Sequence, residues 1–194
     1  MWDLIQRLDS RLATNRPDYY AKLLPGLSQP ELDDFEKKLG LALPESFKEF
    51  YRWRNGQAIG YNVSFAHGYS LMSAYSVIQS RNILNELLEN GDFERENWWH
   101  PDWIPFLDNL SGDNYCLDLA GSFNGVKGQV LSFYHDDVER AIFNASFEKW
   151  LETIVTALEK GLFFSGDNTS ENNESFDNFW KENNPGYPVI EEAS

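Results

Sequence analysis

The sequence is poor in cysteine, histidine and long apolar runs, and each shortage excludes a class of protein. A single cysteine, Cys116, leaves no internal disulfide framework. Three histidines without metal-ligand spacing predict no metal site, and we expect no cofactor. No apolar run approaches the roughly 20 residues of a membrane span. The N-terminus carries Asp3 and no basic segment, which argues against a secretory signal and favours the cytoplasm.

Basic residues are also scarce, and the shortage lies in one half of the chain. The net charge is -15. Residues 1–91 hold 11 acidic and 10 basic residues, whereas residues 92–194 hold 20 acidic and 6 basic residues. Such a surface repels nucleic acid and anionic lipid and attracts basic proteins. An excess of acid is more often a matter of solubility alone, so charge indicates a kind of partner and not a fold.

Apolar periodicity predicts helices in the first half and near the end of the chain. The second helix has a capping box, Ser28 with Glu31, and Gly40 ends it. Short strands are expected at residues 60–65 and 69–72. The clearest helix follows Ser146, where apolar residues recur at helical spacing. We expect these helices at about residues 4–16, 29–39, 44–54, 74–89 and 147–160.

The stretch from Trp98 to Tyr134 predicts the centre of the fold. Residues 114–119 alternate apolar and polar, residues 121–128 are rich in glycine, and residues 130–134 are apolar again, as in a long-looped hairpin. Residues 104–106 read as a strand that Pro105 confines to a sheet edge, and residues 140–144 as another strand. The chain is therefore predicted to be α+β, with a central, mainly antiparallel sheet and helices packed around it.

Residues 1–164 are expected to form one domain. From Ser165 the composition shifts to serine, asparagine and acidic residues, as in a loose tail. Four aromatic residues interrupt that composition, so we expect residues 165–194 to be an acidic tail that is partly docked or flexible. The aromatic residues of this tail are Phe176, Phe179, Trp180 and Tyr187.

Several short motifs resemble the SMI1/KNR4 family of the SUKH superfamily. The first comprises Leu43-Pro44, Phe47, Phe50-Tyr51 and Asn55-Gly56. The second runs from Trp103-Ile-Pro-Phe106 through Ser111-Gly-Asp113 to Cys116-Leu-Asp118. Gln129-Val130, His135-Asp136 and Trp150-Leu151 resemble the closing strand and helix. The motifs follow one another in the family's order, between about Ser28 and Leu158.

The resemblance implies an α+β fold and a protein that acts by binding, not by catalysis. Bacterial members of this family are mostly immunity proteins of polymorphic toxin systems, which neutralise a cognate toxin, often a nuclease. Fungal members regulate cell wall assembly and glucan synthesis. We therefore expect a cognate toxin or other basic protein as partner, and no nucleic acid, membrane or small-molecule substrate. A non-catalytic regulator or scaffold, such as one of cell wall machinery, is the alternative.

The candidate binding residues combine the acids of the second half with neighbouring tryptophans. Trp98 and Trp99 are either part of the core or exposed anchors for a partner, since aromatic residues dominate binding hot spots, whereas Trp103 favours the core. Asp113 is expected to hold its turn through backbone hydrogen bonds. The candidate partner-binding residues are Trp98, Trp99, Asp102, Asp108, Asp136, Asp137 and Glu139.

Catalytic and ion-binding patterns fit less well. A dyad of Cys116 and His135 is conceivable on adjacent strands, but a cysteine in a strand is more often a small buried apolar residue. Residues 108–119 fail the EF-hand pattern, because Leu110 and Leu119 stand where ligands are required. Residues 121–128 are no phosphate loop, because they lie between strands. The sequence therefore predicts neither a catalytic residue nor a metal ligand.

Overall fold

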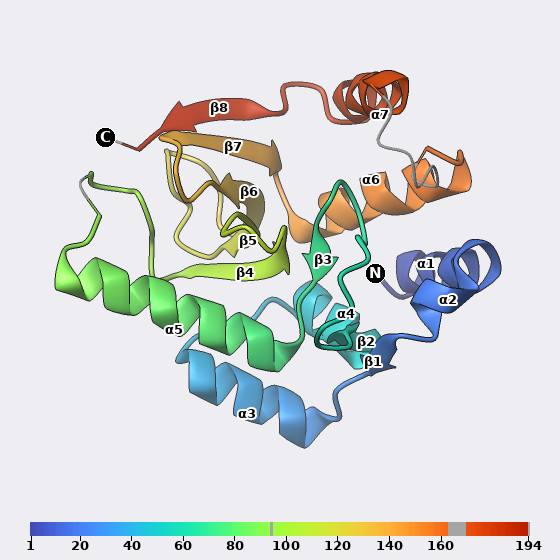
Figure 1. The fold of residues 1–194 in the computed structure, drawn as a ribbon, viewed down its shortest axis with the longest axis horizontal. Helices are drawn as coiled ribbons and strands as arrows, with labels where there is room; N and C mark the ends of the chain where they lie inside the picture. Colours follow the sequence, from blue (N-terminus) through green and yellow to red (C-terminus); the bar gives the residue numbers. More distant parts are fainter. Residues whose placement is uncertain (94, 163–169, 194) are drawn as a thin grey trace.

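The computed structural model describes residues 1–93, 95–162 and 170–193. Its larger sheet has six antiparallel strands in the order β3-β4-β5-β6-β7-β8, and a two-stranded sheet pairs β1 with β2. Figure 1 shows strands β4 to β8 following one another from α5 towards the C-terminus. The strands are β1 (Leu23–Pro25), β2 (Arg54–Gln57), β3 (Ser70–Leu71), β4 (Trp103–Asp108), β5 (Asn114–Asp118), β6 (Gln129–Phe133), β7 (Glu139–Asn144) and β8 (Val189–Glu192).

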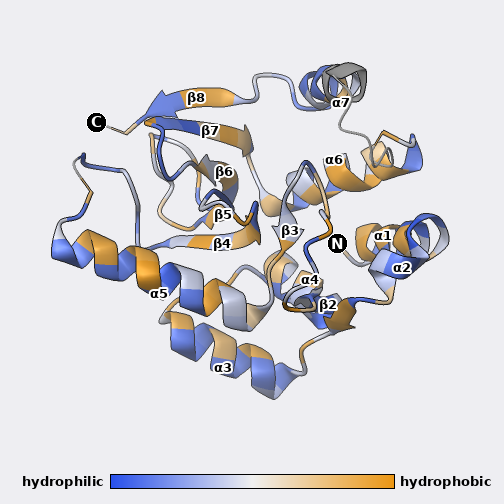
Figure 2. Ribbon diagram, viewed as in Figure 1, coloured by the Kyte–Doolittle hydropathy of each residue, from blue (hydrophilic) through white to orange (hydrophobic). Residues whose placement is uncertain are grey.

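Seven helices surround the sheets in the described part of the chain. Figure 2 shows hydrophobic and hydrophilic residues alternating along α3 and α5, as expected for helices that bury one face. None of the described helices combines the length and apolar composition that a membrane crossing requires. The helices are α1 (Trp2–Asn15), α2 (Pro17–Tyr20), α3 (Gln29–Leu39), α4 (Glu45–Trp53), α5 (Ala74–Asn90), α6 (Phe147–Glu159) and α7 (Ser170–Asn183).

The predicted α+β class with a mainly antiparallel sheet is confirmed. The capping box forms as expected: the Ser28 backbone N–H donates to Glu31 Oε2 at 2.8 Å, and Gly40 ends α3 in the left-handed conformation. The prediction of a strand at residues 60–65 is wrong, because these residues form a loop and the pairing with β4 begins at Ser70. Pro105 lies in β4, which has β3 on one side and β5 on the other. The short strand β3 pairs only with Leu107 and Asp108 of β4 and does not reach Pro105.

Side chains bury both faces of the sheet. On one face, Leu117 and Val130 belong to the main core with Leu151 and Val155 of α6. The other face carries a smaller apolar cluster, covered by the segment between α5 and β4. Leu131 belongs to that second cluster, so α6 packs on the face of Leu117 and not on that of Leu131. The second cluster comprises Leu84, Trp99, Trp103, Cys116, Leu131, Phe133 and Ile142.

The C-terminal segment packs on the rest of the fold and adds a strand to the larger sheet. Phe176, Phe179 and Trp180 of α7 lie in the main core, and β8 pairs with β7 along its whole length. The sequence did not predict β8. Residues 165–169 and 194 of the expected tail lie outside the described residues.

Candidate protein-binding face

Strand register brings several acidic residues to one end of the sheet. Asp108 lies opposite Asn114, which in turn lies opposite Phe133, so the turns after β4 and β6 are neighbours. Glu139 opens β7 at the same end and faces Glu192 of β8. We call this group the acidic end; it comprises Asp108, Asp113, Asp136, Asp137 and Glu139.

A shared carboxylate joins the two turns of the acidic end. Asp113 Oδ1 accepts the His135 backbone N–H at 3.0 Å and lies 2.8 Å from His135 Nδ1. The carboxylate raises the pKa of His135, and its hydrogen bonds with His135 and Asn109 lower the pKa of Asp113 against the opposing effect of burial. The expected backbone bonding of Asp113 therefore exists, but it reaches the neighbouring turn. Within its own turn, Asn109 Oδ1 accepts the N–H groups of Ser111 and Asp113.

The outermost acids point into solvent. Asp136, Asp137 and Glu139 are exposed, and Asp137 Oδ1 accepts only the Glu139 N–H among the described residues. One oxygen of Asp136 and one of Asp113 lie close enough to His135 for the three to form a possible cation site, within 4.8 Å of one another. Because His135 Nδ1 is already bonded to Asp113, we interpret this group as an ion-pair network.

Trp98 lies beside the acidic end in a cleft of about 520 Å³. Its backbone carbonyl accepts a hydrogen bond from Arg140 Nη2 at 2.8 Å, and the guanidinium lies 5.1 Å from its ring centroid. Arg140 also donates to the carbonyls of Asp137 and Glu139 at 2.7 Å each. One buried cation therefore ties the Trp98 segment to the acidic turn.

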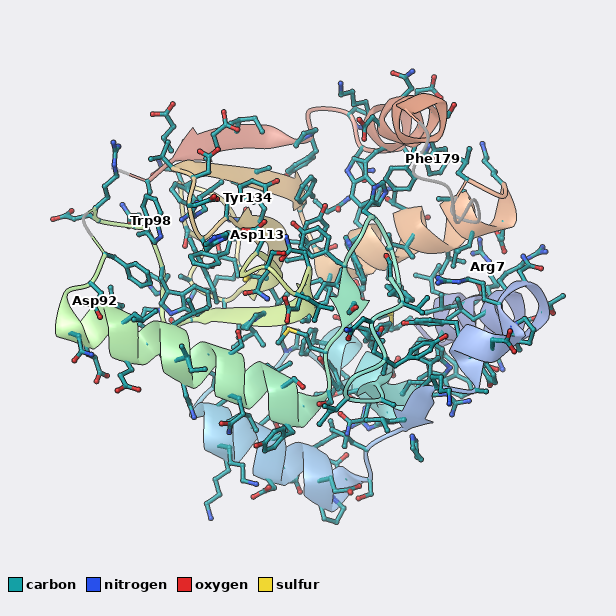
Figure 3. All side chains as sticks on the ribbon, viewed as in Figure 1. Arg7, Asp92, Trp98, Asp113, Tyr134 and Phe179 are labelled. Atoms are coloured by element: carbon teal, nitrogen blue, oxygen red, sulfur yellow. The ribbon has the colours of Figure 1, made fainter. Side chains whose placement is uncertain are left out.

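The cleft beside Trp98 has a mixed lining. Trp98 is half-buried and stacks on Phe93, while Asp92 and His135 supply polar groups. Figure 3 shows Asp92 at the end of α5 and Trp98 above that end of the helix, on the same side of the molecule. We call this the Trp98 cleft; it is lined by Leu87, Asp92, Phe93, Arg95, Trp98, His135 and Val138.

Two of the predicted binding residues lie elsewhere. Trp99 is 2% exposed, packs on Trp103 and Phe133, and donates from Nε1 to Asn85, so the interpretation of Trp99 as an exposed anchor is wrong. Asp102 precedes β4 and therefore lies at the opposite end of that strand. There it lines a separate cavity of about 440 Å³ with Lys127. The expectation that Asp102 joins the other acids is also wrong.

The alternative catalytic interpretation receives no support from the geometry. Cys116 is fully buried, and burial raises the pKa of its thiol well above the ordinary value. Its side chain belongs to the apolar cluster beneath Trp99, whereas His135 is exposed. Cys116 therefore behaves as the small buried apolar residue that the sequence favoured.

Sequence comparison supports the resemblance noted above. The model of the SMI1 / KNR4 family (SUKH-1) matches residues 26–153, about two thirds of the chain. The chain belongs to this family. The match extends from the turn before α3 into α6, so it includes the acidic end and the Trp98 cleft.

Curated relatives come from fungi and from a bacterium. KNR4/SMI1 homolog 2 of Debaryomyces hansenii is 23% identical across 84% of this chain, and the cell wall assembly regulator SMI1 of Saccharomyces cerevisiae is 20% identical across 86%. The chain spans only 36% and 42% of those two proteins. The uncharacterized protein YnaB of Bacillus subtilis is 25% identical across 66% of this chain and 76% of its own length.

Proposed function

We propose that this chain is a non-catalytic immunity protein that binds and neutralises a toxin in the cytoplasm through the acidic end and the Trp98 cleft. The observation that carries the proposal is the gathering of five carboxylates at one end of the sheet, beside a half-buried tryptophan. A nuclease is a suitable target, because a groove built for nucleic acid is basic and would attract such a surface.

The arrangement divides the work of binding between two parts. Exposed charges at the rim of an interface mainly set the association rate through long-range attraction. A desolvated aromatic side chain instead sets the residence time of the complex. Asp136 and Asp137 are exposed and suit the first role, whereas Trp98 is held in place by Arg140 and suits the second.

A regulator with another basic partner is the second candidate. It is favoured by the relatives named as cell wall regulators, one of them the cell wall biosynthesis/cell cycle regulator smi1 of Schizosaccharomyces pombe. The same face would serve such a partner. The two candidates differ in what the partner does, so the identity of a captured protein separates them.

The test compares partner capture and kinetics between charge-reversal variants. Asp136→Lys with Asp137→Lys should slow association several-fold, and the loss should shrink at high salt. Asp33→Lys with Asp34→Lys is the matched control, because it changes the net charge equally on exposed positions of α3. Trp98→Ala should raise the dissociation rate and weaken the free energy of binding by about 2 kcal/mol or more. Trp2→Ala, at an exposed tryptophan of α1, should leave the dissociation rate unchanged.

The design has clear outcomes. A partner with nuclease or other toxic activity, whose growth inhibition is relieved by co-expression of this chain, supports the immunity role. A non-toxic partner supports the regulator. Association that ignores both the charge reversal and the salt concentration would remove the acidic end as the binding surface.

A further inference from the structure

A second cleft opens beside the acidic end, on the side away from Trp98. It has a volume of about 140 Å³ and lies between the loop after β2, the first turn of α5 and the turn after β4. Ile59 and Leu110 line it with Asp108. We call it the Asp108 cleft; it is lined by Gln57, Ala58, Ile59, Gly60, Tyr61, Asn62, Ser70, Leu71, Met72, Ser73, Ser76, Asp108 and Leu110.

The two apolar walls are unusually exposed for large side chains. Ile59 is 80% exposed and Leu110 is 55% exposed. Leu110 has a backbone φ of 64°, a left-handed conformation that bulky residues rarely adopt. The Asp108 carboxylate holds that conformation, since Oδ1 accepts the Leu110 N–H at 2.6 Å. The turn therefore holds Leu110 in a strained backbone conformation in which its apolar side chain is exposed to solvent.

The opposite wall is held just as firmly. Gln57 is buried, and its side-chain amide donates to the carbonyls of Tyr61 and Val63 from beneath the loop. The Tyr61 N–H also donates to the Ala58 carbonyl at 3.0 Å. The exposure of Ile59 is therefore a feature of a braced loop and not of a frayed one.

Asp108 supplies charge at the cleft. Within the described residues, its Oδ2 accepts no hydrogen bond, while Oδ1 is used by Leu110. Burial raises the pKa of Asp108, and the neighbouring carboxylate of Asp113 raises it further. A half-buried carboxylate with an open oxygen is stabilised by a cation placed beside it.

We propose that the Asp108 cleft receives one lysine or arginine side chain of the protein partner, with its aliphatic stem against Ile59 and Leu110 and its cation at Asp108. Long basic side chains combine an apolar stem with a charged head in this way. The cleft, at about 140 Å³, is on the scale of one side chain and is too small for a folded segment.

This inference deepens the proposed function, because it names what a basic partner inserts. It can be tested without the partner, by NMR titration of the ¹⁵N-labelled chain with Nα-acetyl-lysine amide and Nα-acetyl-arginine amide. Both should shift the amide signals of Ile59, Gly60 and Leu110 most. Nα-acetyl-norleucine amide, which has the stem without the ammonium, should bind at least about tenfold more weakly. Methylammonium, which has the cation without the stem, should also bind weakly.

Two variants separate the cleft from the fold and from the rest of the acidic end. Asp108→Asn keeps an acceptor for the Leu110 N–H and should weaken lysine amide binding at least tenfold. Leu110→Gly removes one apolar wall at a position where glycine suits the backbone, so it should weaken binding without loss of stability. Asp136→Asn is the control and should change the affinity less than twofold.

Three results would overturn the inference. If the norleucine amide bound as tightly as the lysine amide, the cleft would recognise only the apolar stem. If the signals of Ile59 and Leu110 did not shift, neither amide would bind in the cleft. Equal weakening by Asp136→Asn and Asp108→Asn would assign the attraction to the acidic end as a whole. The last result would contradict the cleft but not the proposed function. The charge-reversal kinetics described above test that function separately.

Discussion

Replacing Arg140 tests whether one buried cation holds the Trp98 segment and the acidic turn together. Arg140 is fully buried, and its guanidinium lies between the rings of Trp98 and Phe133, at 5.1 and 5.0 Å from their centroids. Burial lowers its pKa to about 10, so the side chain stays charged at neutral pH. No salt bridge from Arg140 to a carboxylate occurs in the described part of the chain. Its charge is satisfied mainly by backbone carbonyls.

The expected cost of Arg140→Met follows from opposing contributions. Three hydrogen bonds to a charged group are worth about 1.5–3 kcal/mol each, and each cation–π contact adds about 0.5–2 kcal/mol. Removing the ion also recovers a desolvation penalty of several kcal/mol. The Met side chain fills much of the space but leaves the carbonyls of Trp98, Asp137 and Glu139 without their donor. We expect a net loss of about 2–4 kcal/mol in the free energy of unfolding.

Urea unfolding followed by far-UV circular dichroism measures that loss, and hydrogen exchange locates it. Exchange should quicken at residues 97–99 and 137–140 more than in α6. Arg95→Met is the matched control, since Arg95 is exposed and, among the described residues, makes one long hydrogen bond, 3.4 Å to the Ala193 carbonyl. It should change stability by less than about 0.5 kcal/mol. An Arg140→Met loss below about 1 kcal/mol, with unchanged exchange, would show that the two segments are held independently.

Two further predictions concern the core and the link between the turns. Leu151→Ala should lower the free energy of unfolding by about 2–5 kcal/mol in urea melts, because Leu151 is fully buried in the main core; a loss below about 0.5 kcal/mol would contradict its place there. Asp113→Asn should lower the pKa of His135 in an NMR titration, because it removes the carboxylate that raises it. Since that pKa is raised in the folded chain, the stability that His135 contributes is fully present below its unfolded pKa and is lost as pH rises through the folded value. The pKa of Asp113 is lowered, so its contribution is lost as pH falls through its own folded value. An unchanged His135 titration would disprove the link.

Elements with strong local signals could be predicted from the sequence. The helix after Ser146 has an unbroken apolar stripe, and the structure shows the Ser146 hydroxyl accepting the Lys149 N–H at 3.1 Å. The hairpin was predicted because apolar and polar residues alternate over residues 114–119, and the glycines of residues 121–128 favour a turn. In such segments the local pattern and the tertiary packing favour the same conformation, so propensity alone suffices.

The C-terminal segment shows where local signals end. α7 is rich in asparagine and acidic residues, and its three buried aromatic residues supply the stability that propensity does not. β8 has four residues, and its Val189 and Ile190 stay partly exposed at the sheet edge. Its pairing with β7 joins residues about 50 positions apart, which no local pattern encodes.

The candidate site was predictable only where neighbours in sequence are neighbours in space. Asp136 and Asp137 lie in the turn between β6 and β7, and Glu139 is the first residue of β7, so their grouping required no tertiary information. Asp102 immediately precedes β4 and Asp108 is the last of its six residues, so the two lie roughly 20 Å apart at about 3.3 Å per residue. One strand therefore cannot bring both to the same end of the sheet, and this strand length was the signal that the sequence offered for separating them.

The acidic residues of the sheet and its turns have two kinds of role, and the first kind is structural. Asp118 is fully buried and accepts the N–H groups of Ala120, Gly121 and Ser122, so it holds the glycine-rich turn. Asp113 joins two turns through its carboxylate. Both belong to the motif by which the chain resembles its family, and their contacts make that motif a determinant of folding.

The exposed acids carry almost no structural contacts. Asp136 and Glu139 can change sign with little effect on the core, because surface substitutions of this kind usually alter stability by less than about 0.5 kcal/mol. Membership of the family therefore accounts for the sheet, the turns and their buried carboxylates. In the proposed function, the choice of partner depends on side chains outside the buried core, namely the exposed acids, Trp98 and the walls of the Asp108 cleft.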